Sequence, residues 1–266
     1  MSERFISTEA LAAQLQEPSL AVLDGRPIMS FLMAHIPGAL QVDWKAFSDP
    51  QAPSKGILHH DVAVLEKKIG ALGIGRGSRV ICYSDPQSCY GEDGRLFWML
   101  RYLGHDDVRI LNGGWTKWQM EKRPIERGPA KAPAPAAFEA ALKPEMVIDR
   151  EALKRVVASG AAGPAILDAR SPGEYSRQNG HVPGAVNIPW NGFYNADGTI
   201  KPPAAITAAL AQQGVDGKKE FVVYCAGGVR CSWLYALMAE AGVTNVKNYI
   251  GSWSDWSSDP SAPVEK

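Results

Sequence analysis

The sequence predicts an α/β protein built from two tandem copies of one domain, each a mostly parallel sheet flanked by helices. Three observations support this fold class: a repeat that spans the chain, short apolar runs that alternate with helical patterns, and a Pro/Ala-rich stretch midway. A length of 266 residues suits two domains of ordinary size. The hydrophobic fraction of 45% is typical of a globular protein with a core.

The repeat consists of four motifs that occur in the same order in both halves. Each half carries Asp-x-Arg, then His-x-Pro-Gly-Ala, then an apolar run that ends in Tyr, and finally Gly-x-Trp. The offset between the copies stays between 138 and 146 residues, as loop insertions and deletions would leave it. The pairs are Leu23–Arg26 with Leu167–Arg170, Ala34–Ala39 with Gly180–Ala185, Val80–Ser84 with Phe221–Cys225, and Gly113–Trp118 with Gly251–Trp256.

The stretch Gly128–Ala137 separates the two copies and is rich in proline and alanine. Because proline fixes φ and lacks a backbone donor, this stretch predicts a semi-rigid, extended linker. We therefore expect a first domain over residues 1–127, a linker over 128–144 and a second domain over 145–266.

Buried strands and helices are predicted to alternate within each copy. Helix-period apolar residues occur over Arg95–Leu103 and over Ser232–Glu240. Strands joined through helices form parallel sheets, and their ligands bind beyond the carboxyl ends of the strands. The expected strands are Ala21–Asp24, Val80–Tyr83 and Val108–Leu111 in the first copy, and Ala165–Asp168, Phe221–Tyr224 and Val246–Tyr249 in the second.

Composition argues against several classes of function. Basic and acidic residues number 28 each, so no global charge favours nucleic acid. The N-terminus lacks the apolar segment of a signal peptide, and no apolar run is long enough for a membrane span. Four cysteines without zinc spacing indicate reduced thiols, a cytoplasmic location and no metal site, and His59-His60-Asp61 is expected to be a solvated loop or helix start.

The loop Cys225–Arg230 is the candidate site of chemistry. Cys225 directly follows a buried run, and Gly227 and Gly228 permit the dihedrals that point successive N–H groups inward. Such amides at a helix N-terminus favour an anion, here a thiolate, and together with Arg230 they lower a thiol pKa from about 8.5. The alternative is that Cys225 is a buried small hydrophobic residue.

These motifs resemble the rhodanese superfamily, specifically tandem-domain thiosulfate and 3-mercaptopyruvate sulfurtransferases. The resemblance rests on Asp-x-Arg, Gly-His-Val-Pro-Gly-Ala, the Cys225–Arg230 loop and the closing Gly-x-Trp, which together span nearly the whole chain. It implies an enzyme that takes sulfur from a small-molecule donor as a persulfide on Cys225. A thiol or cyanide then accepts the sulfur, and no cofactor is needed. Ser84 stands in place of Cys225 in the first copy, which implies that this copy is inactive.

The resemblance also suggests roles for residues around the cysteine. Asp168 and Arg170 are either functional or a structural ion pair, since Asp24 and Arg26 repeat them in the inactive copy. Cys231 faces the core or serves as a resolving thiol. The expected substrate-binding residues are Arg230, Ala226, Gly227, Gly228, Val229 and Arg170, and the expected supporting residues are Asp168, His181 and Trp253.

Two alternatives to this function and the identity of the donor stay open. A non-catalytic binding module need keep neither the cysteine nor the double glycine. The related phosphatases have a loop one residue longer than the six residues of Cys225–Arg230. Ala226 departs from the basic residue of thiosulfate enzymes, and Arg230 from the threonine of mercaptopyruvate enzymes. Glu174 stands where characterised tandem enzymes carry an arginine, for which Arg177 is a candidate substitute.

Overall fold

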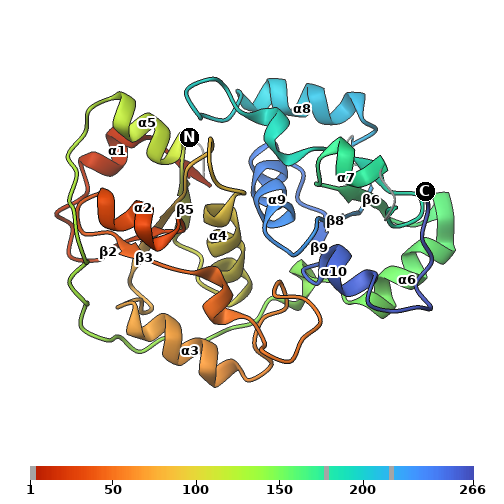
Figure 1. Cartoon of the computed structure of the whole chain (residues 1–266), viewed down its shortest axis with the longest axis horizontal. Helices are drawn as coiled ribbons and strands as arrows, with labels where there is room; N and C mark the ends of the chain where they lie inside the picture. Colours follow the sequence, from red (N-terminus) through yellow and green to blue (C-terminus); the bar gives the residue numbers. More distant parts are fainter. Residues whose placement is uncertain (1–3, 177–179, 216–218) are drawn as a thin grey trace. The chain divides into compact units, whose positions relative to one another are not determined.

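The computed structural model describes residues 4–176, 180–215 and 219–266 of the chain (Figure 1). Contacts divide the chain into two units, each with its own sheet. The expected ranges 1–127, 128–144 and 145–266 stay a prediction. Unit 1 consists of Met1–Ser48, His59–Leu142 and Tyr194–Ile200, and unit 2 consists of Asp49–Leu58, Lys143–Phe193 and Lys201–Lys266.

Unit 1 contains a five-stranded sheet with the order β1-β5-β4-β2-β3, and every neighbouring pair is parallel. This order places β4 in the middle, where its residues are buried on both faces. The predicted strand over Val108–Leu111 is confirmed with the same bounds. The strands are β1 (Phe5–Ile6), β2 (Leu20–Asp24), β3 (Leu40–Gln41), β4 (Arg79–Tyr83) and β5 (Val108–Leu111).

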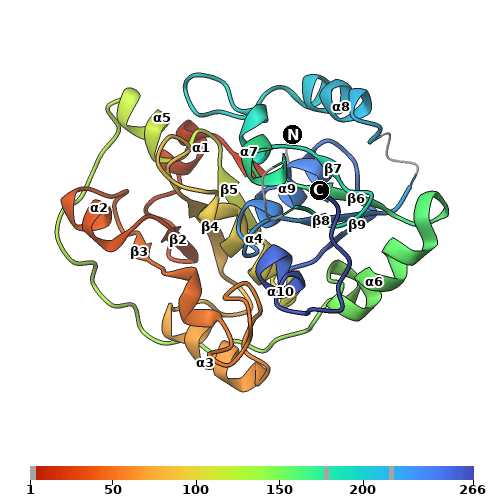
Figure 2. The same ribbon diagram turned by 45° about the vertical axis from the view of Figure 1, so that its right-hand side comes forward.

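The helices of unit 1 connect these parallel strands. Helix α4 packs against β4 and β5, and α1 lies beside α5 in both views (Figures 1 and 2). Helix α3 begins after Asp61, whose carboxylate caps the N–H of Ala63, so His59-His60-Asp61 is a helix start as expected. The helices are α1 (Thr8–Ala12), α2 (Ile28–Met33), η1 (Trp44–Phe47), α3 (Val62–Ala71), α4 (Glu92–Tyr102) and α5 (Gly114–Met120).

Unit 2 contains a four-stranded parallel sheet with the order β7-β6-β8-β9. Helix α9 packs against β8 and β9. The strands are β6 (Ala165–Asp168), β7 (Val186–Asn187), β8 (Phe221–Tyr224) and β9 (Val246–Asn248). The helices are η2 (Pro144–Met146), α6 (Arg150–Ser159), η3 (Gly160–Ala162), α7 (Pro172–Ser176), η4 (Trp190–Phe193), α8 (Pro203–Gln212), α9 (Arg230–Glu240) and α10 (Ser252–Trp256).

Each unit has an apolar core cluster of its own. The core of unit 1 includes Ile81 and Trp118, and that of unit 2 includes Val222 and Trp256, all almost fully buried. Trp118 and Trp256 occupy matching positions at the end of the repeat. Within the described ranges, no helix has the length and apolar character of a membrane span.

Candidate active site

The loop after β8 holds Cys225 at the start of α9. The Gly228 N–H points at the Cys225 Sγ, with a nitrogen–sulfur distance of 3.2 Å. Gly228 has φ +87°, and a Cβ added there would lie 2.5 Å from the Ile250 carbonyl oxygen. Gly227 has no such restriction, because its added Cβ would meet nothing within 4 Å. Glycine is therefore required at Gly228, where the chain turns its amide toward the sulfur.

Cys225 is 1% exposed, and burial by itself raises the pKa of a thiol. Hydrogen bonds from the Cys231 side chain, the charge of Arg230, and the backbone N–H groups of Cys231 and Gly227 act in the opposite direction. Their combined effect holds the pKa of Cys225 well below its ordinary value. The site thus stabilises the thiolate form of Cys225, as the sequence of the loop led us to expect.

Ser252 is a site residue that the sequence reasoning missed. Its hydroxyl accepts the Cys225 N–H at 3.1 Å, and its Oγ lies 3.8 Å from the Cys225 Sγ and 3.6 Å from the Cys231 Sγ. Ser252 is fully buried and has φ +56°, unusual for a residue other than glycine. The available signal was its place inside the closing Gly-x-Trp motif, between Gly251 and Trp253.

Arg230 is the first residue of α9, and its guanidinium is bound by a carboxylate of α7. Its Nη1 donates to Glu174 Oε2 at 2.6 Å, and its Nη2 donates to Glu174 Oε1 at 2.8 Å. These hydrogen bonds lower the pKa of Glu174 to about 2, against a smaller opposing effect of burial. The ion pair connects α7 to the catalytic loop, a contact that the sequence reasoning did not anticipate. The candidate substitute Arg177 lies outside the described residues.

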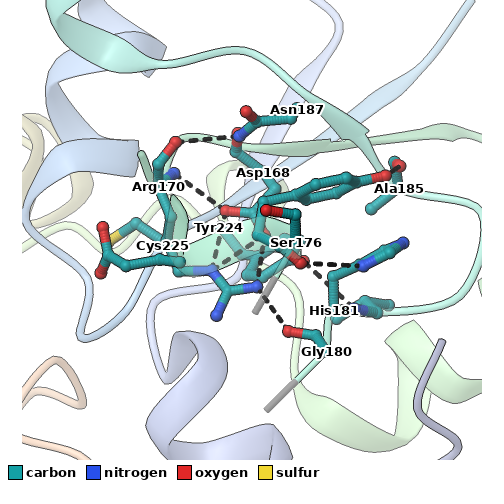
Figure 3. Close-up of polar contacts among 12 residues, drawn as sticks. Asp168, Arg170, Ser176, Gly180, His181, Ala185, Asn187, Tyr224 and Cys225 are labelled. Atoms are coloured by element: carbon teal, nitrogen blue, oxygen red, sulfur yellow. Dashed lines mark hydrogen bonds and ion pairs between the residues drawn. The ribbon is translucent and has the colours of Figure 1, made fainter. Parts of the chain in front are cut away.

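Asp168 and Arg170 form a buried network with Tyr224 at the carboxyl ends of β6 and β8 (Figure 3). The Arg170 Nε and Nη2 donate to Asp168 at 2.7–3.1 Å, and Nη2 also donates to the Gly180 carbonyl at 2.9 Å. The Tyr224 hydroxyl donates to Asp168 at 2.6 Å and accepts the Val182 N–H. Burial and the negative charge of Asp168 raise the pKa of Tyr224, which keeps it a donor.

His181 and Trp253 border this network. The His181 Nδ1 lies 3.2 Å from the Tyr175 carbonyl oxygen, and its ring stacks on that of Tyr175. The Trp253 ring lies 4.7 Å from the Arg170 guanidinium, close enough for a cation–π interaction. His181 thus contacts Tyr175, and Trp253 contacts Arg170, in keeping with a supporting role.

The remaining loop residues connect Cys225 to α10 and to a segment from the first half of the sequence. Ala226 accepts hydrogen bonds from both the N–H and the hydroxyl of Ser254, and Val229 precedes α9. Gly56, in the segment Asp49–Leu58 of unit 2, packs on the loop, since its added Cβ would lie 2.7 Å from the Gly227 carbonyl oxygen. Across the ranges that the structure describes, no cluster of three or more ligating side chains could hold a metal ion.

Comparisons with known proteins agree with this architecture. The rhodanese-like domain family matches residues 7–121 and 149–259. A thiosulfate sulfurtransferase from Azotobacter vinelandii is 35% identical over 96% of this chain and 94% of its own. The sulfur carrier protein TtuD from Thermus thermophilus is 32% identical over 99% of this chain and 97% of its own. The structure of the 3-mercaptopyruvate sulfurtransferase SseA from Escherichia coli has a TM-score of 0.83 and 27% identity, and the match covers 94% of this chain and 98% of SseA.

The site and these similarities define a class of protein: a double-domain α/β enzyme with a thiolate at a helix N-terminus. The chain belongs to the rhodanese family, with the domain present in two copies. It is a sulfurtransferase.

Proposed function

We propose that the protein transfers a sulfane sulfur from thiosulfate or 3-mercaptopyruvate to a thiol or cyanide, through a persulfide on Cys225. The observation that supports this most directly is the lowered pKa of the Cys225 thiol beside the Gly228 N–H. A thiolate is the nucleophilic form of cysteine, and the same amides favour the negative charge of a persulfide. The proposal gives Arg230, Arg170 and the loop residues the substrate-binding role expected from the sequence.

In the first half-reaction, the Cys225 thiolate attacks the outer sulfur of thiosulfate. The sulfur–sulfur bond of the donor breaks, and sulfite leaves with the electron pair. With 3-mercaptopyruvate the carbon–sulfur bond breaks instead, and the pyruvate that leaves takes up a proton at carbon. Either route leaves one additional sulfur atom on Cys225.

In the second half-reaction, the acceptor attacks the outer sulfur of the persulfide. The sulfur–sulfur bond of the persulfide breaks, and Cys225 leaves as the thiolate that the loop stabilises. Cyanide becomes thiocyanate, and a thiol becomes a persulfide. Because the two half-reactions share the Cys225 intermediate, the kinetics are expected to be ping-pong.

Intact-mass spectrometry tests the proposal. Reduced protein is mixed with thiosulfate or with 3-mercaptopyruvate and then with cyanide. We expect the mass of one sulfur atom to be gained and then lost, and no gain in Cys225→Ser. Absence of the adduct with both donors contradicts the proposal, and a phosphate adduct with a phosphoester substrate would favour the phosphatase alternative.

The compartment and the partners form part of the proposal. All four cysteines are buried free thiols, which is consistent with a reducing compartment such as the cytoplasm. A balanced net charge gives no support for a nucleic-acid partner. The partners are then a small-molecule donor and a small acceptor.

A further inference from the structure

Two arginines lie near the Cys225 loop, and a carboxylate offsets the charge of each. Arg170 is bound by Asp168, with the closest oxygen at 2.7 Å. Arg230 is bound by both oxygens of Glu174, in the parallel geometry that makes arginine–carboxylate pairs strong. Neither guanidinium therefore presents its full positive charge to an anionic donor.

Glu174 is a fixed charge. Its Oε2 accepts the Ser171 N–H at 3.0 Å and the Ser171 hydroxyl at 2.7 Å, and its own N–H bonds back to Ser171. This reciprocal pattern is a capping box at the start of α7. With its pKa near 2, Glu174 remains ionised at neutral pH. The capping box holds the carboxylate in position to bind Arg230.

The charges in this site are unfavourable for a donor that carries two negative charges. It must approach the Cys225 thiolate, and Arg230, the cation that lowers the thiol pKa, is already paired with Glu174. Each additional negative charge on the donor is repelled by the thiolate and by Glu174, in a partly buried site where Coulomb interactions are stronger than in water. A donor with one negative charge is repelled less.

We propose that Glu174 is a specificity-determining residue that favours sulfur donors with one negative charge over donors with two. The inference rests on the proposed function, because it presupposes that Cys225 accepts sulfur. The favoured donors are then singly charged compounds with a transferable sulfur, such as mercaptopyruvate or an organic persulfide. For an organic persulfide, the Cys225 thiolate attacks the outer sulfur, the donor sulfur–sulfur bond breaks, and the organic thiolate leaves with the electron pair.

Two donors of almost the same shape isolate the effect of charge. In methanethiosulfonate a methyl group replaces one oxygen of thiosulfate, so that the ion carries one negative charge instead of two. Both donors break a sulfur–sulfur bond, and the leaving group is methanesulfinate or sulfite. The measured quantity is the second-order rate constant for adding one sulfur to Cys225 in a single turnover, followed by intact mass.

Glu174→Gln removes the charge and keeps an oxygen that can complete the capping box. We expect its rate constant for thiosulfate to rise on the order of tenfold relative to that for methanethiosulfonate. Glu174→Asp keeps the charge and should retain the ratio of the unmodified protein, even where the shorter side chain slows both donors. A matched control is Glu151→Gln, which removes an exposed carboxylate paired with Lys154 on α6.

Each outcome decides a different point. An unchanged ratio in Glu174→Gln, or an equal change in Glu151→Gln, overturns the role of Glu174 and leaves the Cys225 persulfide intact. A purely structural role would slow both donors equally and leave the ratio unchanged. If neither donor adds sulfur to the unmodified protein, the proposed function itself fails.

Discussion

The loop after β4 in unit 1 and the loop after β8 in unit 2 are built on nearly the same framework. In unit 1, Arg26 donates to Asp24 at 2.6–3.1 Å, and in unit 2, Arg170 donates to Asp168 at 2.7–3.1 Å. A tyrosine at the end of the central strand donates to the aspartate in each unit, at 2.5 Å and at 2.6 Å. The Asp-x-Arg motif therefore belongs to the architecture of both units, whether or not a nucleophilic cysteine follows.

The charge at the start of the next helix separates the two loops. Helix α4 begins with Glu92 and Asp93, whereas α9 begins with Arg230. In unit 1, burial and the negative charge of Glu92 raise the pKa of Cys89 to about 12. In unit 2, Arg230 helps to lower the pKa of Cys225. The two units thus share a framework, and the charge at the start of the crossover helix has opposite sign in them.

Exchanging the two nucleophile positions is the most severe test of this comparison. We expect the double variant Cys225→Ser with Ser84→Cys to lose at least about a thousandfold in sulfur transfer. The reason is that Asp93, which hydrogen-bonds Ser84 and has a pKa raised to about 7 mainly by burial, disfavours a thiolate at that position. Steady-state rates and intact mass provide the measurement.

The single variant Ser84→Cys is the control for this exchange, and it should still gain one sulfur per chain. A persulfide on position 84 of the double variant would show that the framework alone is sufficient to activate a thiol. The comparison would then lose its electrostatic basis.

Breaking the aspartate–arginine pair tests whether the framework is equivalent in the two units. Asp168→Asn and Asp24→Asn each leave a buried guanidinium without its counter-charge, so each should destabilise its unit by about 3–5 kcal/mol. Chemical denaturation provides the measurement. A variant of Asp168 that keeps its stability and loses sulfur transfer would instead assign this residue a functional role.

The two adjacent glycines of the catalytic loop give a matched pair. Gly228→Ala forces a Cβ toward the Ile250 carbonyl oxygen at φ +87°, so we expect a loss of about 2 kcal/mol or more and a slower gain of sulfur. Gly227→Ala has free space and an ordinary φ, and it should change stability by less than about 0.5 kcal/mol. Equal effects at both positions would show that the Gly228 amide is not specifically placed.

The sequence predicted the elements that carry the site better than the contacts within it. Strands β6 and β8 have the predicted bounds because each is a buried apolar run that ends at a polar or loop residue. Helix α4 begins at Glu92, three residues before the predicted Arg95. The prediction began too late because the first turn of the helix holds the acidic residues Glu92 and Asp93 instead of apolar ones. The periodicity of apolar residues does not detect such a turn.

Ser252 and the Glu174–Arg230 pair escaped prediction for a different reason. Ser252 lies 27 residues from Cys225, and Glu174 lies 56 residues from Arg230. Whether such distant side chains meet depends on how two loops turn at the same edge of the sheet. The sequence of one loop carries no sign of its partner in the other, so the contact becomes visible only in the fold.

Cys231 offers the smallest and most specific test of how unit 2 favours a thiolate. Its side chain hydrogen-bonds the Cys225 sulfur, and it lies fully buried in the first turn of α9, as expected. Cys231→Ala removes that hydrogen bond, so the pKa of Cys225 should rise by about one unit, the value of a hydrogen bond to a charged group. The rate of alkylation by iodoacetamide as a function of pH measures this pKa.

Because the pKa of Cys225 is depressed in the folded protein, its thiolate adds stability above the pKa of an unfolded thiol, and this contribution is lost as pH falls through the folded pKa. In Cys231→Ala the folded pKa is higher, so this contribution should be smaller and its loss should be complete at a higher pH, whereas Cys231→Ser keeps a donor and should stay close to the unmodified protein. If the midpoint of the alkylation rate against pH moves equally in Cys231→Ala and Cys231→Ser, the change in the pKa of Cys225 comes from packing and not from the hydrogen bond.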